Sequence, residues 1–277
     1  MQGGAQDYLV KHNMNGDLIV RSIRHAIERG KIEQALRLAQ QELEQRVEER
    51  TAELSMANLK LQEAVVQLEK AQGDLESSLL GTVQALAATV ESRDPYTAGH
   101  QRRVAELSVI LGRRLGLPED RLKGMYLAAM VHDLGKISVP AEILSKPGKL
   151  SEIELGLIKN HSQAGFEILK DIPFPWPIAQ IILQHHERLD GSGYPHGLSG
   201  EEILKEARIM AVADVVEAMC SHRPYRPALD VRVAKDEIWS KKGVAYDPDV
   251  AGILYHHFDE IWQSLGECKF GISIGEQ

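Results

Sequence analysis

Seven histidine and aspartate residues in the C-terminal two-thirds of the chain have the side chains that a metal centre acting on phosphate requires. Such a centre takes imidazole and carboxylate ligands from several elements and leaves positions open for water and substrate. One residue alone is a weak indication, because a lone histidine or aspartate in a helix is more often packed, capping or solvated. Their joint occurrence in one region favours a metal centre: His100, His132, Asp133, His161, His185, His186 and Asp214.

The adjacent pair His132 and Asp133 is the most informative part of this set. It follows the apolar AAMV and precedes LGK, so two ionisable groups enter a helix that is otherwise typical of a buried element. Burial of a carboxylate without a partner is costly, and a bound metal would remove that cost. Because the two oxygens of an aspartate can bridge two cations, we expect Asp133 to be a catalytic, bridging ligand.

Lys136 lies one helical turn after His132. At that spacing its ammonium would face the same site and stabilise phosphate charge in the transition state, which makes it a second catalytic candidate. The alternative is a surface lysine near a helix end.

Two further segments could bind substrate. In the loop RLDGSGYPHGLSG, glycines permit a sharp turn and a tyrosine offers a ring edge or a hydroxyl to a base or phosphate, so Gly193, Tyr194 and Pro195 are candidates. The alternative is a plain turn. In SHRPYRPAL, Arg223 and Arg226 present planar donor forks suited to phosphate on a segment stiffened by two prolines.

Together these segments resemble the HD superfamily of metal phosphohydrolases. The resemblance begins with HDLGK at 132–136 and continues through the downstream histidines and Asp214, while HHERLDGSGYP at 185–195 is similar to the HD-GYP family. It covers about residues 80–265, including ADVVEAMCSHRPYRPAL and GVAYDPDV.

Membership of that family would imply hydrolysis of the bacterial messenger cyclic di-GMP, to linear pGpG and/or GMP, by a helical domain with two divalent metal ions, iron or manganese. It would make the seven residues above the metal ligands. Some members hold a third metal through a glutamate four residues before the first histidine, whereas this chain has Tyr96 there, so a third ion is doubtful. The remaining histidines fall outside the pattern, and we expect them to be structural or solvated: His12, His25, His196, His222, His256 and His257.

The elements that must position these residues are predicted to be helices. Aromatic residues are only 5% of the chain, and the long stretches rich in Leu, Ala, Ile, Glu, Gln and Arg favour helix over strand. Proline and glycine concentrate between amphipathic runs. The prediction is an all-α fold with an HD-type helical bundle domain at 81–277, whose runs are SLLGTVQALAATVES, GHQRRVAELSVILGRRL, DRLKGMYLAAMVHDLG, SEIELGLIKNHSQAGFEILK and ARIMAVADVVEAMCSH.

Residues 30–80 carry no proline and show a heptad pattern typical of a coiled coil. The d positions are Val47, Leu54, Leu61, Leu68 and Leu75, and the a positions include the polar Asn58 and Gln72. Polar a residues favour a two-stranded parallel coil, so we expect a homodimer with a signalling helix. The alternative is a single long helix whose apolar stripe packs on the enzyme domain.

Residues 1–29 are too few to fold alone. GAQDYLVK followed by DLIVRSIRHAIER resembles the last strand and last helix of a response-regulator receiver domain, with Lys11 at the family's functional lysine. The alternative is an ordinary amphipathic leader.

The bulk properties exclude several classes. A net charge of -8 argues against binding of a nucleic acid polymer, which needs clustered Lys and Arg. Two cysteines give no disulfide framework, and the sequence contains neither a long apolar span nor a signal peptide pattern, so we expect a cytoplasmic protein without a membrane segment.

The expected reaction is in-line attack on a phosphodiester by a hydroxide held between two metals. Two alternatives stay open: a general HD phosphohydrolase of another nucleotide, since fold and metals do not fix a substrate, and a non-catalytic nucleotide-binding signalling module.

Overall fold

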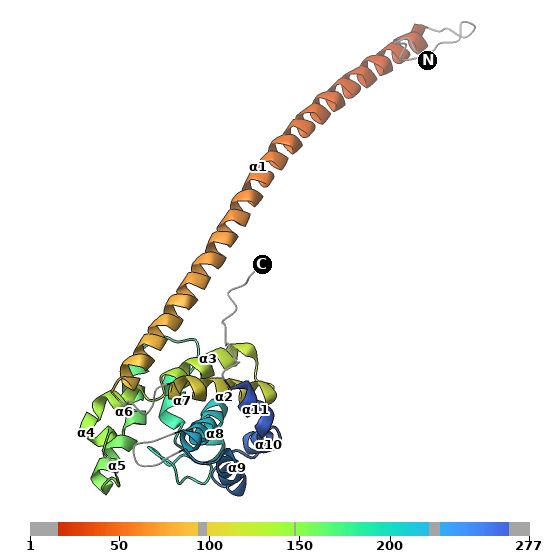
Figure 1. The fold of residues 1–277 in the computed structure, drawn as a ribbon. Helices are drawn as coiled ribbons and strands as arrows, with labels where there is room; N and C mark the ends of the chain where they lie inside the picture. Colours follow the sequence, from red (N-terminus) through yellow and green to blue (C-terminus); the bar gives the residue numbers. More distant parts are fainter. Residues whose placement is uncertain (1–15, 94–98, 147, 222–227, 266–277) are drawn as a thin grey trace. The chain divides into compact units, whose positions relative to one another are not determined.

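The structure is a computed structural model that describes residues 16–93, 99–146, 148–221 and 228–265 (Figure 1). Within these ranges it contains helices and two isolated β-bridges but no strand, which confirms the predicted all-α class. The helices are α1 (Gly16–Glu91), α2 (His100–Arg114), α3 (Glu119–Met130), η3 (Leu134–Ser138), α4 (Ala141–Leu144), α5 (Glu152–Lys159), α6 (His161–Leu169), α7 (Ile178–Gln184), η4 (Gly200–Glu202), α8 (Lys205–Cys220), α9 (Val231–Ser240), α10 (Pro248–His256) and α11 (Phe258–Ser264).

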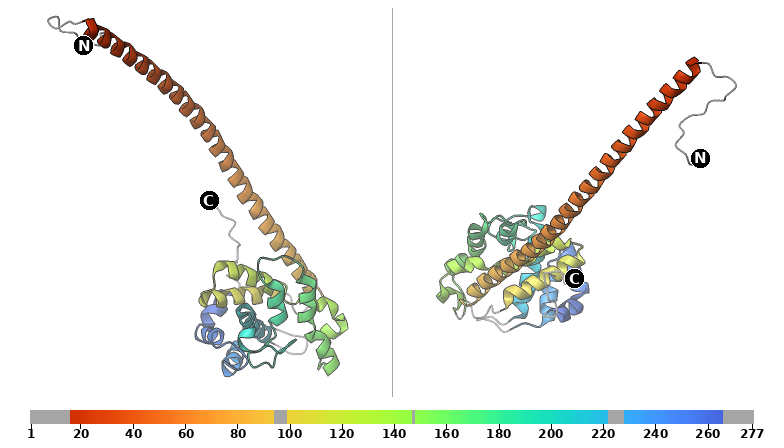
Figure 2. Two further views of the ribbon diagram at one scale, coloured as in Figure 1. Left: turned by 180° about the vertical axis from the view of Figure 1, so that it is seen from behind. Right: turned by 90° about the horizontal axis from the view of Figure 1, so that it is seen from above.

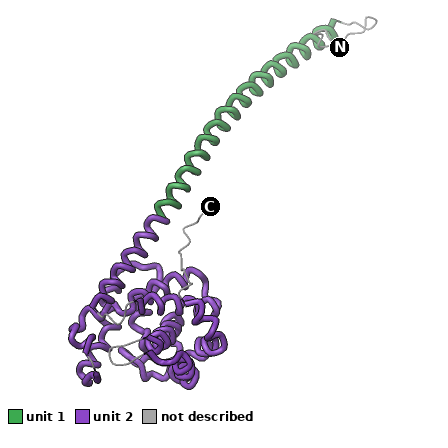
Figure 3. Tube along the Cα trace, in the orientation of Figure 1, with its two compact units in different colours: residues 1–72 green, residues 73–277 purple. Residues whose placement is uncertain are grey.

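The chain divides into two units, residues 1–72 and residues 73–277 (Figure 3). In the first unit the described residues, 16–72, belong to the single helix α1. The predicted receiver-like segment contributes residues 16–29 to this helix, whereas its strand-like DYLV and Lys11 lie outside the described residues. The predicted d positions of the coiled coil are exposed in the single chain, from 57% at Val47 to 71% at Leu75.

The second unit is organised around α8. This helix packs against α2, α3, α7, α9 and α10, so it lies at the centre of the unit (Figures 1 and 2). Ile209, Met210 and Val216 of α8 are fully buried. Burial of a side chain of this size contributes about 1.5–3 kcal/mol to folding. The helix also carries the buried acidic residues Asp214 and Glu217, which a purely apolar core would not tolerate without partners.

Two predicted helices end earlier than the sequence pattern indicates. The prediction placed His132 and Asp133 inside a helix, but α3 ends at Met130 and the pair lies just beyond it. The chain leaves the α conformation at Val131, whose φ is -124°, and continues into the 3₁₀ helix η3, where Lys136 donates its backbone N–H to the Asp133 carbonyl at 2.9 Å. Lys136 therefore follows Asp133 along a 3₁₀ turn and not along an α-helical turn.

The run SEIELGLIKNHSQAGFEILK, expected as one helix, is divided at Asn160. Ser151 and Glu154 form a capping box at the start of α5, and His161 is the first residue of α6. No described helix is both long and apolar enough to cross a membrane.

Candidate metal centre

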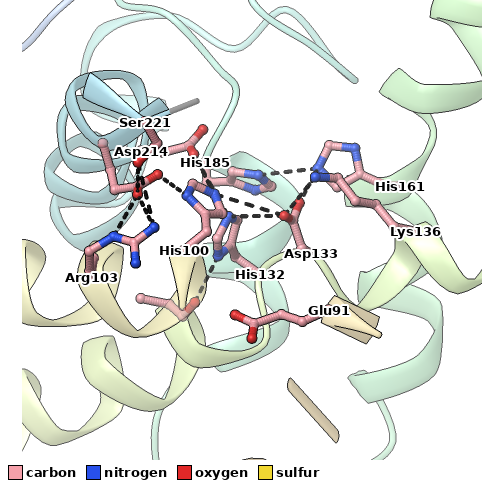
Figure 4. A network of polar contacts seen from close by, with 12 residues as sticks. Glu91, His100, Arg103, His132, Asp133, Lys136, His161, His185, Asp214 and Ser221 are labelled. Carbon is pink, nitrogen blue, oxygen red and sulfur yellow. Dashed lines mark hydrogen bonds and ion pairs between the residues drawn. The ribbon is translucent and has the colours of Figure 1, made fainter. Parts of the chain in front are cut away.

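The predicted ligands come from five places in the fold and meet in the second unit (Figure 4). Two groups of three each place their ligand atoms within 4.8 Å of one another. His161, at the start of α6, joins His185 and His186, which follow α7. The other group is formed by His100, the first residue of α2, His132 after α3, and Asp214 within α8.

Asp133 lies between the two groups. Its Oδ1 is 3.6 Å from Nε2 of His161, which belongs to the first group. Its Oδ2 is 3.7 Å from Nε2 of His132 and 3.9 Å from Nε2 of His100, which belong to the second. One carboxylate thus directs one oxygen to each group, which is the arrangement that a bridging ligand requires.

Three of the histidine rings are held by the backbone in the same way. Nδ1 of His132, His161 and His185 lies 2.7, 2.6 and 2.5 Å from the carbonyl oxygen of the residue three positions earlier. These carbonyls belong to the last turns of α3, α5 and α7, where helix carbonyls lack an intrahelical partner. Since a carbonyl only accepts, Nδ1 carries the proton, and the lone pair of each ring is on Nε2, which faces the centre.

His100 is held by a side chain and not by a carbonyl. Its Nδ1 forms a short hydrogen bond with the Glu217 carboxylate, while its Nε2 is 3.3 Å from Oδ1 of Asp214. Glu217 also accepts hydrogen bonds from Arg103 Nε at 2.8 Å and from the Ser221 hydroxyl at 2.5 Å. The first turn of α2 is therefore joined to the end of α8 through one buried carboxylate.

Buried charges set the protonation of the centre. Burial lowers the pKa of the His100 ring, but hydrogen bonds to Asp214 and Glu217 outweigh it and raise the pKa to about 9. Burial opposes ionisation of Asp133, yet Lys136 and the surrounding histidines hold the pKa of its carboxyl well below the ordinary value. Burial, together with the neighbouring histidines, lowers the pKa of His185 to about 3.

Burial likewise lowers the pKa of His161 and of His186. A ring with a lowered pKa is neutral near pH 7 and offers a lone pair. The first group is therefore made of three neutral imidazoles, which are suitable ligands for a divalent transition metal.

Two of the residues expected to handle substrate, Lys136 and Tyr194, lie beside the same histidines. The Lys136 ammonium donates to Oδ2 of Asp133 at 2.7 Å and is mostly buried. The Tyr194 ring packs against the His186 ring, with 4.7 Å between the centroids. Lys159, which the sequence analysis did not single out, places its Nζ 5.2 Å from the Tyr194 ring centroid. A ring and two ammonium groups beside the histidines form a surface that can receive a base and a phosphate.

The loop containing Gly193, Tyr194 and Pro195 is fixed by one buried carboxylate. Glu187 accepts the backbone N–H of His196 at 2.8 Å and that of Leu198 at 3.0 Å. A Cβ at Gly193 would lie 2.4 Å from Cα of Glu187, so any side chain there would displace the loop. The glycine of this signature is required by packing.

Some residues named in the sequence analysis lie outside the part of the chain that the structure describes: Arg223, Arg226, Tyr96, His12 and His222. The roles predicted for them remain predictions. The other histidines expected to be structural or solvated are exposed: His25, His196, His256 and His257.

Two residues that organise the centre, Glu217 and Glu187, are absent from the sequence-based prediction. Glu217 follows Asp214 by three positions, so the two share a helix face, and this spacing is the signal that could have identified it. Glu187 directly follows His185 and His186, but only the folded loop reveals which amides it accepts.

The donor set fits divalent metal ions by its chemistry. Five imidazoles and two carboxylates converge in a largely buried space, second partners orient four of the five rings, and the charged carboxylates have cationic or imidazole neighbours. Of the described residues, the two groups above are those arranged closely enough to hold a metal ion.

Known proteins resemble this chain over the same region. A model of the family described as HD domain matches residues 84–250. The chain is 35% identical over 253 residues to "Cyclic di-GMP phosphodiesterase response regulator RpfG" of Xanthomonas campestris pv. campestris, covering 91% of this chain and 64% of that protein. It is 40% identical over 153 residues to "3'3'-cGAMP-specific phosphodiesterase 1" of Vibrio cholerae serotype O1, covering 55% of this chain and 36% of that protein.

Among solved structures, an HDG"Y"P protein from Bdellovibrio bacteriovorus shares the fold, with a TM-score of 0.51 and 21% identity over 69% of this chain and 62% of that chain. The chain thus spans less than two-thirds of the length of these relatives. Because the HD-domain match covers more than half of the sequence, the chain belongs to the HD-domain family, and its HHERLDGSGYP segment carries the signature of the HD-GYP branch.

Proposed function

We propose that this chain is a phosphodiesterase that hydrolyses cyclic di-GMP to linear pGpG and/or GMP with two divalent metal ions, iron or manganese. The observation that carries the proposal is the position of Asp133, with one oxygen toward each group of three ligands. The ligands are His161, His185 and His186 for one ion and His100, His132 and Asp214 for the other, with Asp133 common to both. The relative named cyclic di-GMP phosphodiesterase supports the choice of substrate.

Two bound divalent ions would supply a nucleophile at neutral pH and neutralise charge on the phosphate. The residues of the chain hold and orient the reactants. Lys136, beside Oδ2 of Asp133, would donate to a non-bridging phosphate oxygen. The Tyr194 ring and Lys159 would position the nucleotide, and Arg223 and Arg226 would hold its phosphates through their donor forks.

A second substrate is a cyclic dinucleotide that contains one adenine. One relative at 40% identity is named for 3'3'-cGAMP, so the metal centre and the GYP segment together do not separate the two substrates. The base-contacting surface near Tyr194 would make that choice, because an exocyclic amino group at the adenine C6 position donates where the guanine oxygen accepts.

The function is tested with purified protein, cyclic di-GMP or 3'3'-cGAMP, and Mn²⁺ or Fe²⁺ under reducing conditions. We expect linear dinucleotide or mononucleotide with wild-type protein. Asp133→Ala should remove activity and reduce bound metal while the far-UV helical signal persists. Absence of product from every metal and substrate combination would overturn the enzyme proposal, and unchanged metal content in the variant would overturn the bridging role.

We also propose that residues 30–80 form a two-stranded parallel coiled coil that joins two copies of the chain and relays a signal from a partner protein. The exposed heptad residues and the polar Asn58 and Gln72 support it. A receiver-like origin of residues 1–29 and a cytoplasmic location, which the low cysteine count supports, belong to the same proposal.

A further inference from the structure

The last turns of α1 are part of the catalytic unit. Val83, Ala87 and Val90 recur at four- and three-residue spacing, lie on one face of the helix and are buried in the core of residues 73–277. This stretch is therefore packed in place, and its terminal residues have a defined position relative to the metal centre.

Glu91, the last residue of α1, contacts the start of α2. Its Oε2 accepts the backbone N–H of Gly99 at 3.1 Å. Gly99 precedes the ligand His100 and has a φ of 72°, and α2 has no side-chain cap of its own. A carboxylate near the first turn of a helix is also favoured by the helix dipole. Glu91, drawn with the centre in Figure 4, thus fixes the backbone next to a metal ligand from outside α2.

Arg93, two residues later, contacts the backbone of η3. Its Nη1 donates to the carbonyl oxygen of Ile137 at 2.5 Å. Ile137 lies in η3, directly after Lys136 and one turn after Asp133. The two bonds therefore end on two different backbone segments, one that carries His100 and one that carries Asp133 and Lys136.

We infer that Glu91 and Arg93 are positioning residues that tie the end of α1 to both of these segments and thereby set the separation of His100 from Asp133. The inference rests on the proposed metal centre. Loss of either bond would let the first turn of α2 move relative to η3, and metal affinity falls when ligands must be brought together on binding. The metal affinity of the centre then depends on where α1 ends.

A purely structural role for these residues makes a different prediction. It would lower the stability of the metal-free protein without changing the affinity of the folded molecules for metal. The test therefore compares Mn²⁺ binding, followed by the electron paramagnetic resonance signal of free Mn²⁺, with the melting temperature of the metal-free protein, for the full chain in each case.

We expect Glu91→Ala and Arg93→Ala each to weaken Mn²⁺ binding about 10-fold. Glu91→Gln keeps an acceptor and should restore most of the affinity. Ser92→Ala is the matched control, because the Ser92 hydroxyl donates to the Thr89 carbonyl of the same helix end, at 2.7 Å, and the variant should bind like wild type.

Wild-type affinity in both alanine variants, with or without a lower melting temperature, would overturn the positioning role while leaving the proposed function intact. If the wild-type chain itself did not bind Mn²⁺, the metal centre and the inference would both be wrong. Should Glu91→Ala fail to fold, Arg93→Ala decides the question, because Arg93 is partly exposed and its side-chain contact is at the surface.

Discussion

The imidazoles of His132, His161 and His185 owe their orientation to main-chain atoms. Each ring takes a carbonyl three residues earlier as the partner of Nδ1, so no neighbouring side chain has to be of a particular type. His100 opens α2, and its Nδ1 takes the Glu217 carboxylate instead of a carbonyl. The sensitivity of the four ligands to nearby substitutions should differ accordingly.

Replacement of Glu217 should impair metal binding without removing a predicted ligand. Glu217→Ala leaves His100 Nδ1 without its carboxylate and takes one acceptor from Arg103, so we expect Mn²⁺ affinity to fall about 10–100-fold. Glu217→Gln keeps the shape and one acceptor oxygen, and its loss should be smaller. Isothermal titration with Mn²⁺ measures both.

Glu167→Ala serves as the control for Glu217, because it removes an exposed ion pair with Lys170, the residue that follows α6. Equal affinities for wild type and Glu217→Ala would show that the His100 ring is held in place by other contacts.

Residue types, their order and the family resemblance were enough to single out the seven candidate ligands, and the structure brings them together. They were not enough for Glu217 or Glu187. Both act on neighbours far along the sequence or on backbone amides, and those partners are defined only when α2 meets α8 or when the loop after His186 folds back.

At the scale of elements, most of the candidate ligands lie at helix termini. His132 and Asp133 follow α3, His185 and His186 follow α7, and His161 opens α6. Hydrophobic periodicity predicted the helices but extended two of them through their ends. Apolar residues such as Val131 continue the pattern beyond the helix, because burial, and not helical conformation, is what the pattern reports.

Contact between η3 and α6 makes Gly135 sensitive to substitution. A Cβ at Gly135 would lie 1.9 Å from the carbonyl oxygen of His161, which is backbone and cannot rotate away. We expect Gly135→Ala to lower the free energy of unfolding by about 1–3 kcal/mol and to weaken metal binding, since both segments carry ligands. Urea denaturation and Mn²⁺ titration measure the two effects.

Gly156→Ala is the matched control for Gly135, since nothing lies within 4 Å of its added methyl group on α5. It should raise stability by about 0.5–1 kcal/mol through helix propensity. If Gly135→Ala were as stable as wild type, the close approach of η3 to α6 would be wrong.

The contacts of the buried Asp247 carboxylate at the start of α10 predict that the free energy of unfolding depends on pH. It caps the helix through the Asp249 amide at 3.0 Å and accepts from Lys205 at 2.9 Å. Burial raises the pKa of its carboxyl, but Lys205 and the cap amides outweigh burial and lower the pKa. The charged carboxylate therefore stabilises the fold at pH values above ~4, the pKa of an aspartate in the unfolded chain. This contribution is lost as the pH falls through the lower pKa that the carboxyl has in the folded protein.

Asp247→Asn keeps a capping oxygen and removes the charge. We expect wild type to be more stable than this variant by about 1–2 kcal/mol between about pH 7 and pH 5, with the difference shrinking below ~pH 4. Urea denaturation at several pH values follows it. Asp230→Asn, at the exposed start of α9, should show a smaller difference, and a constant difference for Asp247→Asn down to about pH 3 would contradict the assignment.

At the scale of the whole molecule, the heptad face of α1 predicts association of two chains. Leu54 and Leu61 are exposed by 66% and 62% in the single chain, and a second helix would cover them. Leu54→Asp combined with Leu61→Asp should convert a dimer to a monomer in light scattering, because charges at successive d positions would be buried at the seam. Deletion of residues 30–80 should likewise give a monomer in light scattering.

Met56→Asp is the control for the dimer, since Met56 lies on the outer face of the heptad and is already exposed. A monomeric wild-type chain would refute the coiled coil and would favour the alternative of a solitary helix. The sequence pattern predicts which residues face a partner, but a single chain carries no record of the partner itself.

The carbonyl contacts of the three rings have a further consequence for how the centre acquires metal. Since Nδ1 of each ring is already bound to the main chain, the lone pairs converge without any side chain having to search its rotamers. Little conformational entropy of these three rings is then lost on metal capture, and the spacing of their Nε2 atoms is set by helix ends. The fit to ions of different radius would therefore depend on the backbone at those helix ends as well as on the types of the ligands.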